Sequence, residues 1–180
     1  MYGVNILVEE HDHILAFIQL VRAECLQVIE GAEPDTRRFR EFLDFARNYA
    51  DKHHHGKEEK ILFRYMTAEL GPIADKLINQ GMLVEHEIGR THLRDLEDAL
   101  DSYEKEPASQ AKLDILANAS TWCRDLERHI ERENSAVFTF GENKLDETIK
   151  QRVNEETESF ETDMAANKQK YETWLAEQLK

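Results

Sequence analysis

Histidine and glutamate residues recur in this sequence in a pattern that suits metal binding. One set of three positions occurs twice, 75 residues apart, and each copy has an isolated histidine followed later by His-x-x-x-Glu. On a helix, a spacing of four places two side chains on one face, one turn apart. Four imidazoles and two carboxylates can therefore converge on metal ions inside a helical bundle. The six residues are His11, His54 and Glu58 in the first copy and His86, His129 and Glu133 in the second.

The same repeat separates these candidates from the other histidines of the chain. The sequence has eight histidines, and a shift of 75 leaves His13, His53, His55 and His92 without a histidine counterpart. His13 and His92 also project from other faces of their predicted helices than the repeated histidines do. We therefore expect neither of them to reach the same metal.

The second helix requires a choice of register, because His55 and Glu59 have the same spacing as His54 and Glu58. The residues one and two turns before His55 are polar, whereas those before His54 are alanines. We therefore assign His54 and Glu58 as ligands. His55 stays a possible extra ligand, an outer hydrogen-bonding group or an exposed imidazole, and His53 is expected in the outer layer or at the surface.

An alternative without metal is a pair of buried ion-pair clusters, with Arg90 and Arg94 as counter-charges. Burying four imidazoles and two carboxylates in an apolar seam is costly unless the charges are compensated, and metal ions compensate them most directly. The nitrogen-rich ligand set suits iron that is held open to small molecules. A zinc hydrolase is a weaker alternative, since zinc sites usually have three or four ligands.

Apolar residues at helical spacing predict the elements that carry these positions. Short connections between them require antiparallel neighbours, so we predict an all-α, up-down-up-down four-helix bundle with an additional C-terminal helix. Residues 1–143 would form the metal-binding bundle, and the acidic helix in 144–180 would pack on the bundle or on a partner, which makes a homodimer possible. Clusters of Gly and Pro at 31–36, 69–72, 104–109 and 140–143 delimit helices at about 4–30, 36–68, 73–104 and 108–139, and a tail at about 145–180.

The composition narrows the class of protein. A chain of 180 residues with 41% hydrophobic residues, 7 Gly and 3 Pro suits one helical core. The net charge of -14 argues against binding to nucleic acid or to anionic membranes. No apolar segment approaches the roughly 20 residues of a spanning helix, and the N-terminus lacks the features of a signal peptide, so we expect a cytoplasmic protein. Cys25 and Cys123 lie on apolar stripes and are predicted to be buried free thiols.

The motifs around the ligands resemble those of the hemerythrin-like family, also called HHE cation-binding domains. The similar segments are Glu10-His11, HHGKEEKILF (54–63), MLVEHEIGR (82–90) and HIERENSAVF (129–138), which together span about 130 residues. The resemblance implies two non-haem iron ions with an oxo or hydroxo bridge. It also implies that Glu58 and Glu133 bridge the ions and that His11, His54, His86 and His129 complete their coordination.

One position departs from the oxygen-carrying members of that family. Those members have a fifth histidine one turn after the ligand of the third helix, where this chain has Arg90. We therefore expect a di-iron protein that binds or reacts with a small molecule, such as oxygen, peroxide or nitric oxide, without assigning it as an oxygen carrier. The alternatives are an iron or oxygen sensor and an iron donor for the repair of iron-sulfur clusters. Whether the protein is an enzyme stays open.

Overall fold

The computed structural model describes all 180 residues, and every regular element is a helix. Six helical rods follow one another along the chain, and three of them contain π-helical segments, which we label η. The first rod is α1 (Tyr2–Ile29), and the second comprises α2 (Thr36–Phe45), η1 (Ala46–His55), η2 (Glu58–Leu62) and α3 (Phe63–Glu69). The others are α4 (Gly71–Leu77), η3 (Ile78–Met82) and α5 (Leu83–Lys105); α6 (Ser109–Arg132), η4 (Glu133–Val137) and α7 (Phe138–Lys144); α8 (Glu147–Asp163); and α9 (Ala165–Gln178).

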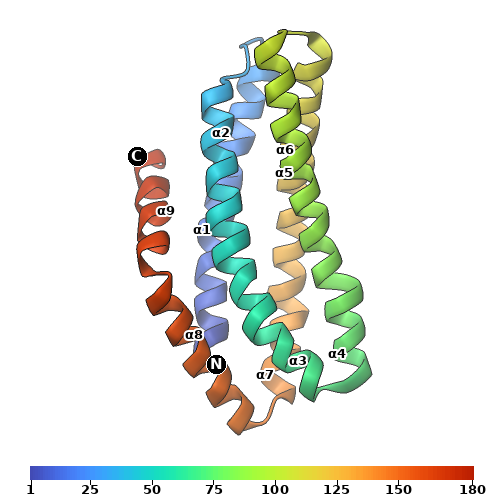
Figure 1. Ribbon diagram of the computed structural model, residues 1–180, viewed down its shortest axis with the longest axis vertical. Helices are drawn as coiled ribbons and strands as arrows, with labels where there is room; N and C mark the ends of the chain where they lie inside the picture. The colour runs from blue at the N-terminus through green and yellow to red at the C-terminus, as the bar shows by residue number, and fades with distance from the viewer.

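The first four rods form the predicted antiparallel bundle (Figure 1). α6 packs against both α5 and α1, and α2 and η1 pack against α5. The tail differs from the single helix that the sequence suggested, because the chain bends at Met164 and forms α8 and α9. These two helices lie along the outside of the bundle, where α8 contacts α1 and η2 and α9 contacts α1 and η1.

The break predicted at residues 140–143 is wrong, because Gly141 lies inside α7. A Cβ atom at Gly141 would come within 3.1 Å of the sulfur of Met66, so this glycine permits close packing of two helices and does not end one. The helix ends instead at Lys144. The carboxylate of Asp146 then accepts a hydrogen bond from the backbone N–H of Ile149 and caps α8.

Two apolar clusters fill the bundle, one on each side of the layer that holds the predicted ligands. The larger, with 27 buried residues, extends towards the end where α2 begins, and the smaller, with 14, lies around α3, η3 and α7. The ligand layer is therefore a polar layer enclosed between two apolar ones.

Two further expectations concern the cysteines and membrane spans. Cys25 and Cys123 are buried free thiols, as predicted. None of the helices is both long enough and apolar enough to cross a membrane.

Candidate metal centre

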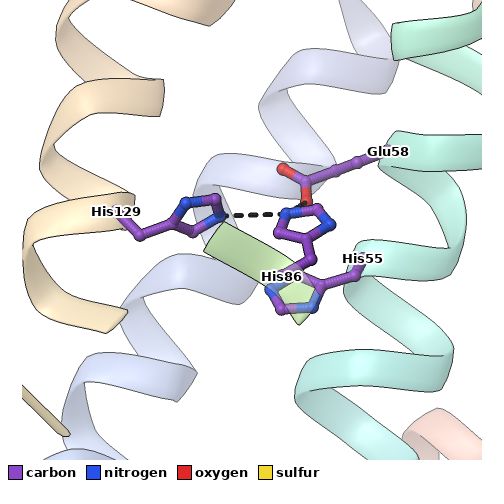
Figure 2. Close-up of side chains that lie close together, drawn as sticks. All are labelled: His55, Glu58, His86 and His129. Carbon is purple, nitrogen blue, oxygen red and sulfur yellow. Dashed lines mark hydrogen bonds and ion pairs between the residues drawn. The ribbon is translucent and has the colours of Figure 1, made fainter. Parts of the chain in front are cut away.

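Two groups of ligand-type atoms meet in the middle of the bundle, and in each group the atoms lie within 4.8 Å of one another. All the side chains involved are buried, and the most exposed of them, His55, has a relative exposure of 7%. Figure 2 shows the group that contains His55. We call His11 and His54 with Glu58 and Glu133 the two-histidine cluster, and His55, His86 and His129 with Glu58 the three-histidine cluster.

The two carboxylates lie between the clusters. Each directs one oxygen towards a histidine of the two-histidine cluster and the other oxygen towards a histidine of the three-histidine cluster. The O–Nε2 distances are 3.5 Å on both sides of Glu58 and 3.2 Å on both sides of Glu133. This arrangement suits carboxylates that join two cations. The histidine partners are His54 and His86 for Glu58, and His11 and His129 for Glu133.

Seven atoms of these side chains are buried without any hydrogen-bond partner, which tests whether the residues fit metal ions. Leaving buried polar atoms unpaired is costly, whereas cations would satisfy them directly. All seven belong to the inner faces of the two clusters, so the donor set fits a pair of cations. The atoms are Nε2 of His11, His54 and His55 and both carboxylate oxygens of Glu58 and Glu133.

The outer nitrogen of every histidine in the clusters faces an acceptor. With Nδ1 donating to that acceptor, Nε2 keeps its lone pair for a metal, and the ring is held in place. Four of the five acceptors are carboxylates, which also increase the basicity of the ligand. The pairs are His11 with Asn134 (2.9 Å), His54 with Glu10 (3.0 Å), His55 with Asp51 (3.3 Å), His86 with Glu59 (2.7 Å) and His129 with Glu85 (2.8 Å).

Protonation of the centre reflects its burial. Burial, with the neighbouring His11, lowers the pKa of His54 to about 4 and keeps that imidazole neutral. Burial and the charge of Glu133 raise the pKa of Glu58 well above its usual range. For Glu133 itself, burial is outweighed by the nearby imidazoles of His129 and His11, so its pKa falls well below the usual range. The pKa values of the two carboxylates therefore shift in opposite directions.

Three consecutive histidines are buried at the end of η1, a result that the sequence did not predict. The wider π-helical turn brings neighbouring residues inward together, and π-helical turns are often found at functional sites. His54 enters the two-histidine cluster and His55 the three-histidine cluster, while His53 lies in the outer layer against Glu10. In an ideal α-helix, His55 would lie with Asp51 on a polar, exposed face. That expectation was wrong, because the ring of His55 is buried and its Nδ1 lies 3.3 Å from a carboxylate oxygen of Asp51.

Arg90, at the position where a fifth histidine was expected, supports the outer layer. Its guanidinium lies 2.7 Å from a carboxylate oxygen of Asp51 and 2.7 Å from one of Glu59, the acceptors of His55 and His86. The rings of these two histidines are stacked, with centroids 3.8 Å apart. Arg90 therefore orders one side of the three-histidine cluster from outside.

The ion-pair alternative lacks its expected counter-charges. Arg94 pairs with Glu87 at the surface, and neither it nor Arg90 contacts Glu58 or Glu133.

The two remaining histidines lie outside the clusters. His13 bonds to the hydroxyl of Tyr49, and His92 lies 3.8 Å from a carboxylate oxygen of Asp125.

The 75-residue repeat extends to the outer partners, so the sequence itself carries a signal for them. Glu10 and Glu85 are related by the repeat and bond to the related histidines His54 and His129. Glu59 and Asn134 are related in the same way and bond to His86 and His11. Only His55 and its partner Asp51 have no counterpart, since the repeat pairs them with Ile130 and Leu126.

Comparison with known proteins identifies a family. Residues 2–140 match the family model described as Hemerythrin HHE cation binding domain. No curated protein and no solved structure matches the chain. The matched region contains every residue of both clusters, whereas α8 and α9 lie beyond it.

The geometry predicts that His55 is a ligand. Changing His55 to Ala should weaken the binding of one of two metal ions at least about 100-fold, because even outer partners of ligands contribute 10–100-fold. Competition with a chelator would measure both affinities. His92→Ala is the matched control and should bind both ions as the unchanged protein does. Two unaltered affinities in His55→Ala would contradict the assignment.

Metal loading should release protons. Burial disfavours protonation of His129, but the nearby carboxylate of Glu133 and the hydrogen bond to Glu85 raise its pKa to about 9. At about pH 7 the metal-free centre should therefore hold a proton on His129, which must leave before this side chain binds metal. Metal affinity should increase as the pH rises towards about 9. Calorimetry in buffers of different ionisation enthalpy would count the protons, and loading without proton release would refute this expectation.

Proposed function

Because the chain belongs to the hemerythrin HHE cation-binding domain family, we propose that it is a non-haem di-iron protein that binds or reacts with oxygen, peroxide or nitric oxide. The seven unpaired buried atoms between the two clusters are the main support for a pair of cations. Two iron ions would supply accessible valence changes and coordination positions for a small molecule. The nitrogen-rich donor set favours iron over magnesium, which prefers oxygen ligands.

The residues of the chain would divide between two ions. Each cluster contains four residues, and Glu58 belongs to both. Three histidines would serve one ion and two would serve the other, with Glu133 in the two-histidine cluster and one of its oxygens 3.2 Å from Nε2 of His129. The outer acceptors hold the protons on Nδ1, and the apolar clusters on both sides of the layer limit access of water.

A cavity of about 270 Å³ offers a route to the centre for a small molecule. Its wall includes His55, His86 and His129, with Gly89 and Trp122 beside them. Liquid water occupies about 30 Å³ per molecule, so the cavity has ample room for a diatomic molecule or peroxide. We propose that exogenous ligands approach from this side, at the three-histidine cluster.

Two other roles remain as alternatives. An iron donor for cluster repair would have to release its metal, and the nearly complete burial of the ligands favours retention. A sensor would have to couple the centre to another part of the chain, and contacts between the tail and the residues around His54 favour that role over the donor.

Iron reconstitution tests the proposed function. We expect about two irons per chain, from the two clusters, and a near-ultraviolet charge-transfer band that changes on addition of oxygen, peroxide or nitric oxide. Metal analysis and optical spectra before and after each addition would measure both. A colourless protein after reconstitution would exclude the di-iron proposal.

Narrowing the cavity tests the route. A Cβ at Gly89 would lie 3.8 Å from the indole nitrogen of Trp122, which is ordinary contact, so Gly89→Leu should be accommodated while the longer side chain fills part of the cavity. Azide or nitric oxide should then associate more slowly with the iron-loaded protein, by about tenfold, which corresponds to about 1.4 kcal/mol. Gly81→Leu, in η3 and outside the cavity, is the control. Equal association rates in stopped-flow measurements of the two variants would argue for another route.

A further inference from the structure

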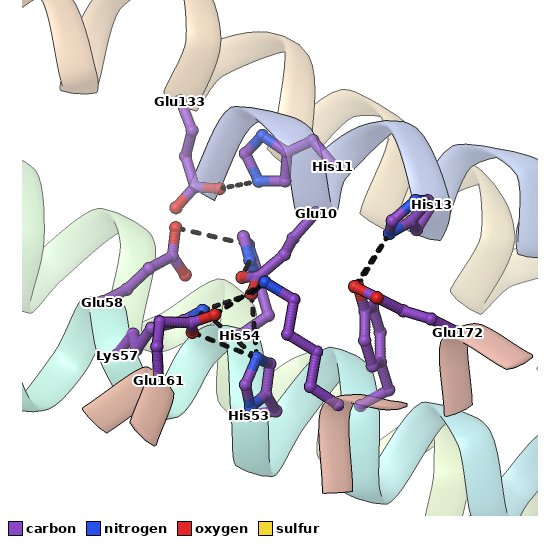
Figure 3. A network of polar contacts seen from close by, with 12 residues as sticks. Glu10, His11, His13, His53, His54, Lys57, Glu58, Glu133, Glu161 and Glu172 are labelled. Atoms are coloured by element: carbon purple, nitrogen blue, oxygen red, sulfur yellow. Dashed lines mark hydrogen bonds and ion pairs between the residues drawn. The ribbon is translucent and has the colours of Figure 1, made fainter. Parts of the chain in front are cut away.

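A network of buried charges lies beside the two-histidine cluster, on the side covered by the tail (Figure 3). The ammonium of Lys57 bonds to both Glu10 and Glu161, and the side chains of Lys57 and Glu10 are each only 1% exposed. His53 lies 2.8 Å from the same oxygen of Glu10. The other oxygen of Glu10 accepts the hydrogen bond from Nδ1 of His54. The network therefore ends on a residue of the proposed metal centre.

Glu161 belongs to α8, outside the region that matches the family model. The tail is firmly docked around it. The ring of Phe160 lies 5.8 Å from the ring of His53. The amide of Asn167 donates to the backbone carbonyl of Asn48 in η1 at 3.0 Å. These contacts place a carboxylate from the tail next to the outer partner of a predicted ligand.

The second half of the repeat shows how the same arrangement looks without a tail. Lys57 shifted by 75 is Arg132, which bonds at 2.6 Å to Glu85, the outer partner of His129. That pair is open to solvent, with side-chain exposures of 47% for Arg132 and 30% for Glu85. Water screens the charge of an exposed cation, whereas a buried cation acts at full strength on its neighbours. In the second half of the repeat, solvent screens Arg132. In the first half, Glu161 contacts Lys57 in place of solvent.

We propose that Glu161 is a positioning residue for the metal centre, and that it acts by sharing the ammonium of Lys57 with Glu10. Sharing leaves more negative charge on Glu10, which then stays a strong acceptor for Nδ1 of His54. A stronger acceptor makes the imidazole a better metal ligand. The inference rests on the proposed metal centre and adds a contribution from the tail to it.

The variant Glu161→Gln tests this role in the full-length protein. The amide keeps the shape of the side chain but removes its charge. Both Lys57 and Lys168, which lies 3.9 Å from Glu10, would then have Glu10 as their remaining charged partner in this network and weaken its bond to His54. Glu156→Gln is the matched control, because Glu156 also lies on α8 and joins the tail to the bundle through Arg64 and Tyr65. Both variants lose one tail carboxylate, but only Glu161 shares a cation with Glu10.

Paramagnetic proton NMR of the protein loaded with Co²⁺ gives a readout that general stability would not change. Each histidine ligand should show a shifted, exchangeable Nδ1 proton, and Glu161→Gln should move one of these signals while Glu156→Gln moves none. Chelator competition should show one of the two metal ions leaving faster in Glu161→Gln, by about tenfold, as expected for an outer partner.

The outcomes separate this inference from the proposed function. Shifted signals that are identical in Glu161→Gln and in the unchanged protein would overturn the role of Glu161 and leave the metal centre intact. Equal effects of the two variants would also overturn it, since they would indicate a loss of docking in general. An absence of any shifted signal would overturn the metal centre itself, and with it the inference.

Discussion

The structure depends on burying the carboxylates of Glu58 and Glu133 side by side between five imidazoles. Two such groups in an apolar bundle repel each other, and neither has a hydrogen-bond partner in the chain. The opposite pKa shifts of the two carboxylates express that conflict, which cations between them would remove. Without such cations, this layer would be a costly defect between two well-packed apolar clusters. The surrounding features can be understood as consequences of holding it in place.

The outer layer meets this requirement by fixing the direction of each imidazole. Because every Nδ1 has an acceptor, the five Nε2 atoms all face inward and none needs to find its orientation when a metal arrives. The outer carboxylates need cations of their own in turn, and Lys57, Arg90 and Arg132 provide them. The charges therefore alternate outward from the centre, from ligands to outer carboxylates and then to cations. A change at one of these cations can reach a ligand through two hydrogen bonds, as from Lys57 through Glu10 to His54.

Much of this arrangement could be predicted from the sequence. Helical periodicity identified the four rods, and the 75-residue repeat picked out His11, His54, His86 and His129 with the two carboxylates. His55 could not be chosen in that way, because it has no repeated counterpart and its position depends on a π-helical turn. Such a turn changes which residues face inward, and a pattern based on 3.6 residues per turn does not reveal it. Gly141 was misassigned for a related reason, since its role depends on Met66 from a distant rod.

The two halves of the repeat differ most in what surrounds the cation behind each outer carboxylate. In the second half Arg132 is partly in water, which weakens its hold on Glu85. In the first half α8 covers the equivalent residue, Lys57, so that water cannot screen its charge, and Glu10 would be its only carboxylate partner without α8. The same helix supplies Glu161. The element that excludes water from Lys57 therefore also brings a carboxylate that takes the place of water. The tail is therefore electrostatically part of the centre, although it lies outside the region that the family model describes.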